Sequence, residues 1–516
     1  MSIKLAFACI LSTIRRFNTS DIGLLLHIRI ILFSTIVFAG ATLPGCQPSI
    51  RYASVESGIT NVHSVSSIPV LQSRIDSLLL PELFPPATAG IKIVSLETGE
   101  SLYELNPRNL FTPASNQKLL TSATALKILG GHFEFATSAG IDTSDTATIC
   151  VVGHGDPLIK TSDLDSLASV FARTLPSGRR WTILGDTSFF DDAYWGKGWM
   201  WDDEPDPTIP YISSLSVNGN SVTVHVSPGD SAFLPLTATI DPPTTIARIG
   251  ESGTTVADSV RDPLSFTRHW KEGANVIDIS GEMRVHDSQK IETISIANPG
   301  LYFVDLLAAR LRFNAVDIGT TGLRRAPPAM QELASISHSL DSVIVRMNKE
   351  SDNLSAECIV KCMAAFSGET PARFETGIRF MKRTLQSMGV DTTNMVLADG
   401  SGVSRYNLLS PETIVSVLNA MYRDSVLFPL YYSSLPVAGK DGTLTNRMAT
   451  GPATNNLRAK TGTVSGVSAF SGYVRSADGE MLGFSIMMQG IPGKVRPYRR
   501  IQDSLGNVLA GFSRKE

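Results

Sequence analysis

Three short motifs, far apart in the chain, constrain the fold more than any other feature. The first is Ser115-x-x-Lys118, at the start of an apolar run; the others are Ser351-Asp352-Asn353 and Lys460-Thr461-Gly462. From Ser115 to Ser351 is 236 positions, and from Ser351 to Lys460 is 109. If these side chains act together, one domain must receive all three motifs and must accommodate a long insertion after the first.

Ser115 and Lys118 offer a nucleophile and its base. Three positions apart on a helix, they lie on one face, one turn from each other. A Ser hydroxyl is weak until a base removes its proton. A Lys amine buried beside other positive groups can lose its charge and act as that base. The pair alone is a weak indication, because most S-x-x-K spacings are ordinary surface sequence, but this is the only one in the chain.

The Ser-Asp-Asn motif supplies two further polar groups. Ser351 is placed to relay a proton between Lys118 and a leaving amine, and Asn353 is placed to hold an amide carbonyl of the substrate. Taken alone, the motif also fits a helix cap for the run that begins at Leu354. Both interpretations can hold at once.

The sequence Lys460-Thr461-Gly462-Thr463 follows a strand pattern. Lys460 is a cation for a terminal carboxylate, which the hydroxyls of Thr461 and Thr463 could also bind. Gly462 would let a substrate backbone lie close against the strand. The backbone N–H groups of Thr463 and Ser115 would together form an oxyanion hole. A lone Lys-Thr-Gly is a common edge-strand turn, so the prediction depends on the order and combination of the three motifs.

The pattern of elements predicts helices around an antiparallel sheet, an α/β arrangement. A chain of 516 residues is too long for one ordinary core. Residues 69–135 and 327–516 carry the motifs, whereas residues 136–326 are strand-rich with Gly and Pro turns and predict an inserted, mainly β region. One helix is expected to begin at the Ser-x-x-Lys motif and to end at Gly130-Gly131. Further helices are expected at 71–80, 299–313, 342–348, 356–366, 371–388, 411–421 and 498–512. Strands are expected at 89–94, 101–103, 148–152, 221–226, 457–461, 467–475 and 481–489.

The first 46 residues are interpreted as an export leader. Arg29 precedes a short apolar run that ends in Leu43-Pro44-Gly45-Cys46. The ending is similar to a bacterial lipoprotein box, which predicts lipidation of Cys46 and an exported, periplasmic protein with a membrane anchor. An ordinary signal peptide with an incidental Cys is the alternative, and residues 1–28 also fit an over-extended gene start. The polar residues 47–68 are interpreted as a tether.

Charge and cysteine usage narrow the functional classes. The net charge of −3 gives no indication of nucleic-acid binding. Cys358 and Cys362, four apart on an expected helix, are predicted to be small buried residues, since no His or acidic cluster accompanies them as metal ligands. No metal and no cofactor is expected.

With these motifs the chain resembles the D-alanyl-D-alanine carboxypeptidase/endopeptidase family of class C low-molecular-mass penicillin-binding proteins. The long gap after S-x-x-K is similar to this family, in which extra domains are inserted there. The resemblance covers roughly residues 70–512 and implies a penicillin-binding/β-lactamase-like transpeptidase domain with a large, mainly β insertion. Further similar stretches are residues 153–157, 198–203, 347–353, 399–405 and 435–444.

The resemblance implies a serine DD-peptidase that trims or opens peptidoglycan stem peptides. Its acyl-enzyme would form on Ser115, and β-lactams would acylate the same residue. In the family, an Asp of the inserted region contacts the amino end of the diaminopimelate side chain. The Trp-x-Asp pattern places this role on Asp203, for which a turn or salt-bridge carboxylate is the alternative.

Two other functions remain open on the sequence. A β-lactamase or esterase on the same scaffold needs an efficient deacylating water, but the Glu-containing loop of class A lactamases is absent at the required spacing. A non-catalytic, wall-binding lipoprotein with a decayed site is the other alternative. The intact motif positions argue against it: Ser115, Lys118, Ser351, Asn353 and Lys460.

Overall fold

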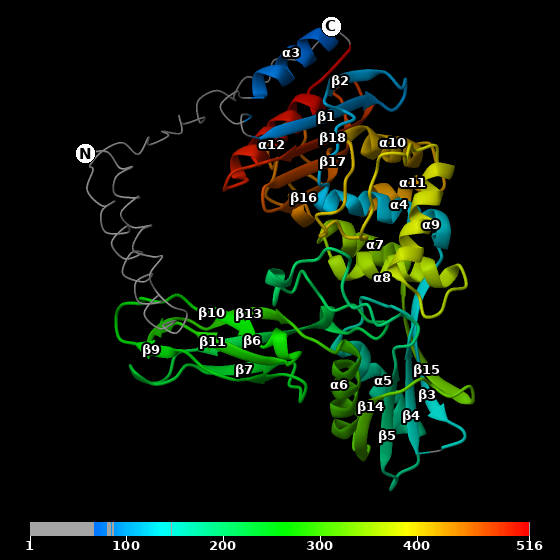
Figure 1. Ribbon diagram of the computed structural model, residues 1–516, viewed down its shortest axis with the longest axis vertical. Helices are drawn as coiled ribbons and strands as arrows, with labels where there is room; N and C mark the ends of the chain where they lie inside the picture. The colour runs from blue at the N-terminus through cyan, green and yellow to red at the C-terminus, as the bar shows by residue number, and fades with distance from the viewer. Residues whose placement is uncertain (1–66, 80–83, 85–86, 146, 515–516) are drawn as a thin grey trace, which may run out of the picture. The chain divides into compact units, whose positions relative to one another are not determined.

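The computed structural model describes residues 67–514, with the exception of 80–83, 85–86 and 146 (Figure 1). The predicted leader, the lipidation site Cys46 and the tether up to residue 66 lie outside the described residues. Within the described part of the chain, no helix combines the length and apolar character needed to cross a bilayer.

A five-stranded antiparallel sheet forms the centre of the motif-bearing region. Its order is β16-β17-β18-β1-β2, so strands from the two ends of the chain lie next to each other. The predicted hairpin and the three predicted C-terminal strands are confirmed. The strands are β1 Thr88–Ser95, β2 Ser101–Leu105, β16 Arg458–Val464, β17 Val467–Arg475 and β18 Met481–Gln489.

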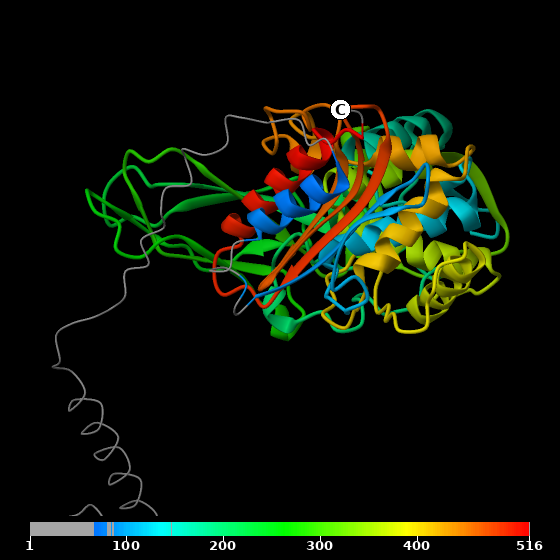
Figure 2. The same cartoon turned by 90° about the horizontal axis from the view of Figure 1, so that it is seen from above.

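Helices cover both faces of this sheet, which confirms the predicted α/β arrangement. Figure 2 shows α3 (Ile68–Leu78) and α12 (Arg496–Ala510) side by side along one face, where their apolar residues join the sheet in one hydrophobic core. The helices that belong to the core on the other face are α4 Gln117–Leu129, α7 Leu340–Lys349, α8 Asn353–Phe366, α9 Phe374–Ser387, α10 Pro411–Tyr422 and α11 Phe428–Ser434.

Helix α4, which follows the first motif, is buried on nearly all sides. It packs against α8, α9 and α10, and apart from Gln117 and two lysines its residues are apolar or small on all sides rather than amphipathic. Gly130 ends the helix with a φ of +83°, a conformation that favours glycine. The rigid setting of α4 fixes the position of the short 3₁₀ turn Ala114–Asn116 that precedes it.

A second five-stranded sheet, β14-β5-β4-β3-β15, brings residues 134–142 beside residues 330–339. Strand β3 begins two residues before the predicted start of the insertion and β15 lies after its predicted end, and the two strands pair in one sheet. Helices α5 (Thr161–Thr174) and α6 (Pro299–Phe313) pack on this sheet. The sequence analysis predicted α6 as a helix but did not predict α5. The strands are β3 Glu134–Asp142, β4 Thr148–Gly153, β5 Trp181–Asp186, β14 Ile318–Leu323 and β15 Met330–Ser339.

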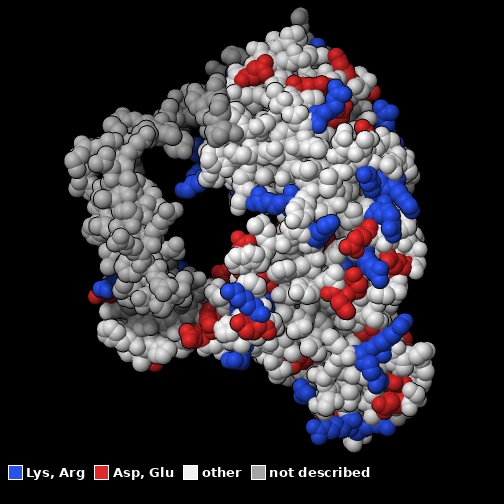
Figure 3. Space-filling view, viewed as in Figure 1, with Lys and Arg blue, Asp and Glu red and all other residues white. Residues whose placement is uncertain are grey.

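The rest of the insertion forms three small sheets with the orders β13-β6-β7, β10-β11-β8 and β12-β9. Their strands are short, as the Gly and Pro turns of this region predict. They are β6 Ser221–Ser227, β7 Thr237–Asp241, β8 Arg248–Ile249, β9 Thr254–Val256, β10 Ser265–Arg268, β11 Val276–Ser280, β12 Glu282–Arg284 and β13 Lys290–Ser295. On the face shown in Figure 3, basic and acidic side chains are interspersed.

Candidate active site

The three motifs meet at one cleft with a volume of about 770 Å³. One wall comes from the motif-bearing region and includes Ser115, Ser351, Asn353 and Thr463. The other wall comes from the insertion, at residues 200–209, 264–266 and 292–294. The structure therefore brings together residues that are hundreds of positions apart in sequence.

Ser115 lies in the 3₁₀ turn before α4, and Lys118 lies in the first turn of that helix. The Lys118 side chain is fully buried. Its Nζ lies 3.2 Å from Ser115 Oγ, 2.6 Å from Asn353 Oδ1 and 2.7 Å from the carbonyl oxygen of Ser401. Three acceptors thus hold the amine within hydrogen-bonding distance of the proposed nucleophile.

Burial lowers the pKa of Lys118 to about 8. The charges of Asp399, Glu357 and Asp352 oppose this shift, because each carboxylate favours the protonated amine. An amine with a pKa near neutrality has a substantial neutral fraction, which a general base requires.

The Ser-Asp-Asn motif forms both a helix cap and part of the cleft. Asp352 caps α8 by accepting a hydrogen bond from the Ser355 N–H at 2.7 Å, and Asn353 is the first residue of that helix. Ser351 has a φ of +63°, a strained conformation for a residue with a side chain, of the kind often found at functional sites. The cap interpretation is therefore confirmed, whereas the proton relay at Ser351 and the substrate contact at Asn353 stay predictions.

Lys460, the second lysine of the cleft, is also fully buried. Its Nζ donates to Ser351 Oγ at 3.0 Å and to the Thr461 carbonyl at 2.9 Å. Burial and the neighbouring charge of Lys118 hold the pKa of Lys460 well below its ordinary value. No carboxylate of the described residues forms an ion pair with Lys460.

Strand β16 is the edge strand of its sheet. The backbone N–H and C=O groups of its odd-numbered residues point away from the neighbouring strand β17. Ala459 N donates to Pro436 O, and the Thr461 carbonyl accepts from Lys460, so these groups face away from β17. By the alternation of an antiparallel pair, the Thr463 N–H shares this orientation. It is therefore available at the cleft edge, as the predicted oxyanion hole requires.

Gly462 is required by the close approach of β16 to the turn that carries Ser115. A Cβ at this position would lie 2.8 Å from Pro113 O and 3.0 Å from Ser115 N. The sequence analysis expected the substrate backbone to lie against Gly462. In the structure, the backbone of Pro113 and Ser115 lies against it. The glycine thus allows β16 to approach the turn that carries Ser115.

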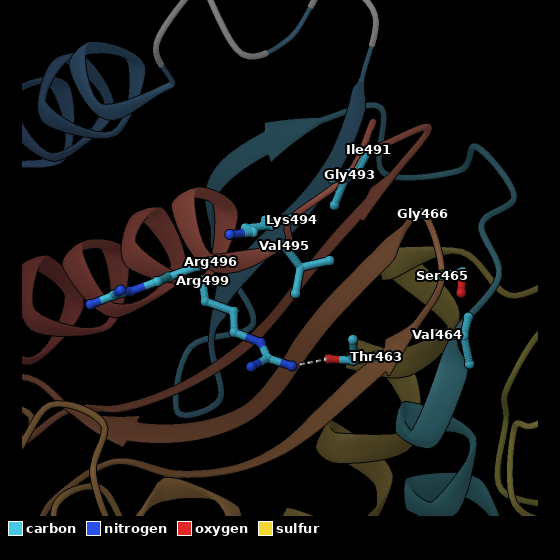
Figure 4. Close-up of a pocket in the computed structure, with 10 residues that line it drawn as sticks. All are labelled: Thr463, Val464, Ser465, Gly466, Ile491, Gly493, Lys494, Val495, Arg496 and Arg499. Atoms are coloured by element: carbon cyan, nitrogen blue, oxygen red, sulfur yellow. Dashed lines mark hydrogen bonds between the residues drawn. The ribbon is translucent and has the colours of Figure 1, made fainter. Parts of the chain in front are cut away.

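Thr461 and Thr463 each have a hydrogen-bond partner within the chain. Thr461 Oγ1 donates to Thr443 Oγ1 at 2.8 Å. Thr463 Oγ1 accepts from Arg499 Nη2 at 2.9 Å, across a second, open pocket beside the β16–β17 hairpin (Figure 4). The sequence did not single out Arg499, because no motif links α12 to the Lys-Thr-Gly strand.

Two further buried acids, which the sequence analysis assigned no role, organise the turn at residues 399–407. Asp399 accepts from Gly402 N at 2.8 Å, from Ser404 N at 2.7 Å and from Asn407 Nδ2 at 2.7 Å. Glu357 accepts from Ser401 N at 2.8 Å, and burial raises its pKa above the usual range. The turn's similarity to a known family stretch was the only signal available from sequence.

Asp203 lines the cleft on the insertion side, in a 3₁₀ turn at Trp201–Asp203. One of its carboxylate oxygens accepts from Met200 N at 3.3 Å, which fits the turn interpretation. Burial raises the pKa of this carboxyl. No basic residue of the described chain forms a salt bridge with it, so the salt-bridge alternative has no support in the structure.

Cys358 and Cys362 are free thiols buried in α8, as the sequence predicts. Burial raises the pKa of both thiols. They are packed as small apolar residues and face the helical core rather than the cleft lining.

Comparison with known proteins gives a consistent result. The family model of the D-Ala-D-Ala carboxypeptidase 3 (S13) family matches residues 71–509. A D-alanyl-D-alanine carboxypeptidase from an Actinomadura species is 30% identical over 503 residues, covering 93% of this chain and 90% of the relative. A D-alanyl-D-alanine carboxypeptidase DacB from Haemophilus influenzae is 26% identical over 437 residues, covering 82% of this chain and 90% of the relative.

Among solved structures, penicillin binding protein 4 (dacB) from Haemophilus influenzae superimposes with a TM-score of 0.75 at 23% sequence identity. The match covers 86% of this chain and 99% of that protein. It therefore includes the insertion as well as the motif-bearing region.

Proposed function

The chain belongs to the D-Ala-D-Ala carboxypeptidase 3 (S13) family of serine DD-peptidases, and from this premise we propose that Ser115 is the residue that carries the acyl group. The observation that supports this most is the 3.2 Å contact between Ser115 Oγ and the buried amine of Lys118. A nucleophile and a base at this distance satisfy the geometric condition for proton abstraction.

The proposed reaction uses these side chains in the positions described above. Neutral Lys118 takes the proton of the Ser115 hydroxyl as Oγ attacks the carbonyl carbon that precedes the terminal D-alanine. The N–H groups of Ser115 and Thr463 stabilise the oxyanion of the tetrahedral intermediate. Ser351, hydrogen-bonded to Lys460, passes its proton to the leaving amine and takes up the proton held by Lys118, so Lys118 returns to its neutral form as the C–N bond breaks. Water then hydrolyses the acyl-enzyme.

Lys460 is proposed to bind the carboxylate next to the scissile bond, together with the Thr461 and Thr463 hydroxyls and the backbone at Gly462. Lys460 is buried and no carboxylate in the described part of the chain pairs with it, so a substrate carboxylate would supply the missing negative charge. β-Lactams carry a carboxylate in the same relation to their reactive carbonyl. They would therefore acylate Ser115.

The substrates proposed for this site are peptidoglycan stem peptides, which the enzyme trims or opens. Asp203, on the opposite wall, would bind the free amino group of a diaminopimelate side chain. We further propose export to the periplasm and lipid attachment at Cys46, on the strength of the leader sequence. Loss of fatty-acid labelling in a Cys46→Ser variant would test the attachment.

The main experiment is mass spectrometry of the penicillin-treated protein. The adduct is expected on the peptide that contains Ser115, and a Ser115→Ala variant should form none. An adduct on another residue, with Ser115 free, would overturn the assignment. Digestion of purified cross-linked muropeptides would then give the ratio of carboxypeptidase to endopeptidase activity.

Labelling kinetics separate the alternatives. A DD-peptidase retains bound penicillin, whereas a β-lactamase or esterase would release it rapidly and turn over. A non-catalytic wall-binding protein would not be labelled by a fluorescent penicillin at all.

A further inference from the structure

One loop of the insertion, residues 199–208, contacts the surroundings of Lys118 from two directions. Of the three acceptors around Lys118 Nζ, Ser115 Oγ is the reacting atom. The other two, Asn353 Oδ1 and the Ser401 carbonyl, only hold the amine in place. Asn353 donates a hydrogen bond to the loop, and the turn that carries Ser401 accepts one from the loop through Asp399.

The first connection passes through Asn353. Its Nδ2 donates to the carbonyl oxygen of Thr208 at 2.5 Å, while its Oδ1 accepts from Lys118. An asparagine amide has one donating and one accepting end. The Thr208 carbonyl therefore selects the orientation in which the accepting oxygen faces the lysine.

The second connection passes through the turn at residues 399–407. The buried indole of Trp199 donates from Nε1 to Asp399 Oδ2 at 2.9 Å. The other oxygen of Asp399 accepts from Gly402 N. This carboxylate therefore links the indole to the backbone that directly follows Ser401, whose carbonyl accepts from Lys118.

The turn has little freedom to adjust on its own. Gly402 has a φ of +86°, and a Cβ there would lie 1.8 Å from Ala114 O, so the turn is in backbone contact with the residue before Ser115. A change in the turn would thus move both the nucleophile and the base. Misplacing a catalytic group by about 1 Å can reduce a rate about 10²-fold.

We propose that the loop 199–208 positions the general base, so that the insertion contributes to acylation chemistry and not only to substrate recognition. This inference rests on the proposed function, in which Lys118 is the base. Trp199 is a positioning residue in this account, since it acts through Asp399 and touches no reacting atom.

The test is a Trp199→Phe variant of the full chain, which keeps a buried aromatic ring and removes the donating N–H. With benzylpenicillin, the acylation rate constant at saturation should fall roughly tenfold to a hundredfold. The half-saturating concentration should stay near the wild-type value, because the cleft wall that receives the ligand is unchanged. This separation of rate from binding would not arise from a loss of stability alone.

Trp181→Phe is the matched control. Trp181 is a buried tryptophan of the same insertion, but it lies in β5 within the separate core of that sheet. This variant should lose stability on heating and still be acylated like the wild type. If Trp199→Phe does not fold, β-(3-benzothienyl)alanine at position 199 removes the N–H with almost no change of shape.

Each outcome is decisive. Slow acylation with unchanged half-saturation in Trp199→Phe alone supports the inference. Acylation within about threefold of wild type overturns it and leaves the proposed function intact. Equal defects in both tryptophan variants overturn it in favour of a general structural role. A wild-type protein that is not labelled at Ser115 would instead refute the proposed function itself.

Discussion

The two walls of the cleft differ in charge and in burial. The wall from the motif-bearing region holds two fully buried lysines, Lys118 and Lys460, each fixed by hydrogen bonds. The wall from the insertion carries carboxylates that are exposed or half-buried, at Asp202, Asp203 and Asp206. Buried, fixed groups suit bond making and breaking, whereas accessible charges suit the recognition of a long, polar substrate.

The two lysines also differ from each other. Three carboxylates act on Lys118 and keep its pKa at about 8 in spite of burial, whereas no carboxylate among the described residues acts on Lys460. Lys118 is therefore balanced between its two protonation states before any ligand arrives. Lys460 lacks the negative charge that would stabilise its cation, and a substrate carboxylate would provide it. The difference supports the proposed roles, proton transfer at Lys118 and ligand binding at Lys460.

Replacing Lys118 should have the largest effect. Lys118→Ala is expected to lower the rate of penicillin acylation about 10²–10⁴-fold, the usual loss for a positioned general base. Stopped-flow labelling measures the rate, and circular dichroism checks the fold. Lys127→Ala is the matched control, because Lys127 lies on the same helix in an ion pair with Asp424. Acylation of Lys118→Ala within about threefold of wild type would show that another group is the base.

The pH dependence of acylation tests the protonation state of Lys118. The active form is the neutral amine, whose fraction rises with pH through the pKa of about 8. Acylation at low penicillin concentration should therefore fall about tenfold for each pH unit below this value. A rate that is flat between pH 6 and 9 would contradict the assignment.

Lys460→Ala should distinguish ligand binding from chemistry. For a peptide with a free terminal carboxylate, kcat/KM should fall about tenfold to a hundredfold, as expected for a charged hydrogen bond of about 1.5–3 kcal/mol. A peptide amidated at that carboxylate should lose much less. Equal losses on both peptides would give Lys460 a role in proton transfer and would remove the difference between the two lysines.

The smallest expected effect belongs to the insertion wall. Asp203→Ala should lower kcat/KM about tenfold for a peptide that carries diaminopimelate, because a charge-assisted contact is lost. Acylation by a penicillin without that amino group should stay unchanged. Asp258→Ala is the control variant, because Asp258 is an exposed carboxylate of the insertion outside the cleft lining. Equal losses on peptide and penicillin would mean that Asp203 supports the fold rather than the substrate.

Elements with strong local patterns were predictable from sequence. The helix at residues 299–313 and the strands at 467–475 and 481–489 agree with the structure to the residue. Helix α5 was missed because its many Ser, Thr and Asp residues fit the loop-rich character of the insertion. Strand β15 was missed because it is an edge strand without a fully buried residue, so its sequence shows no apolar alternation.

The candidate site likewise contains some residues that the sequence could predict and others that it could not. The motif residues were recognisable because their chemistry and order are carried by side chains at short spacing. The roles of Trp199, Thr208 and Asp399 could not be predicted. Their hydrogen bonds join residues that are 145 to 200 positions apart in sequence, and the contact at Thr208 uses a backbone carbonyl, which every residue type provides. Glu357 was hidden for the same reason, since its partners are backbone N–H groups of a distant turn.

The buried thiols give each region its own reporter of unfolding. Cys150 is enclosed in strand β4 of the insertion, and Cys358 and Cys362 are enclosed in α8 of the motif-bearing region, all free and almost without solvent exposure. A water-soluble alkylating reagent can reach a thiol in such a place only when the surrounding structure opens. The order in which Cys150 and the α8 pair become alkylated in rising denaturant would therefore show whether the two regions unfold as one cooperative unit or separately.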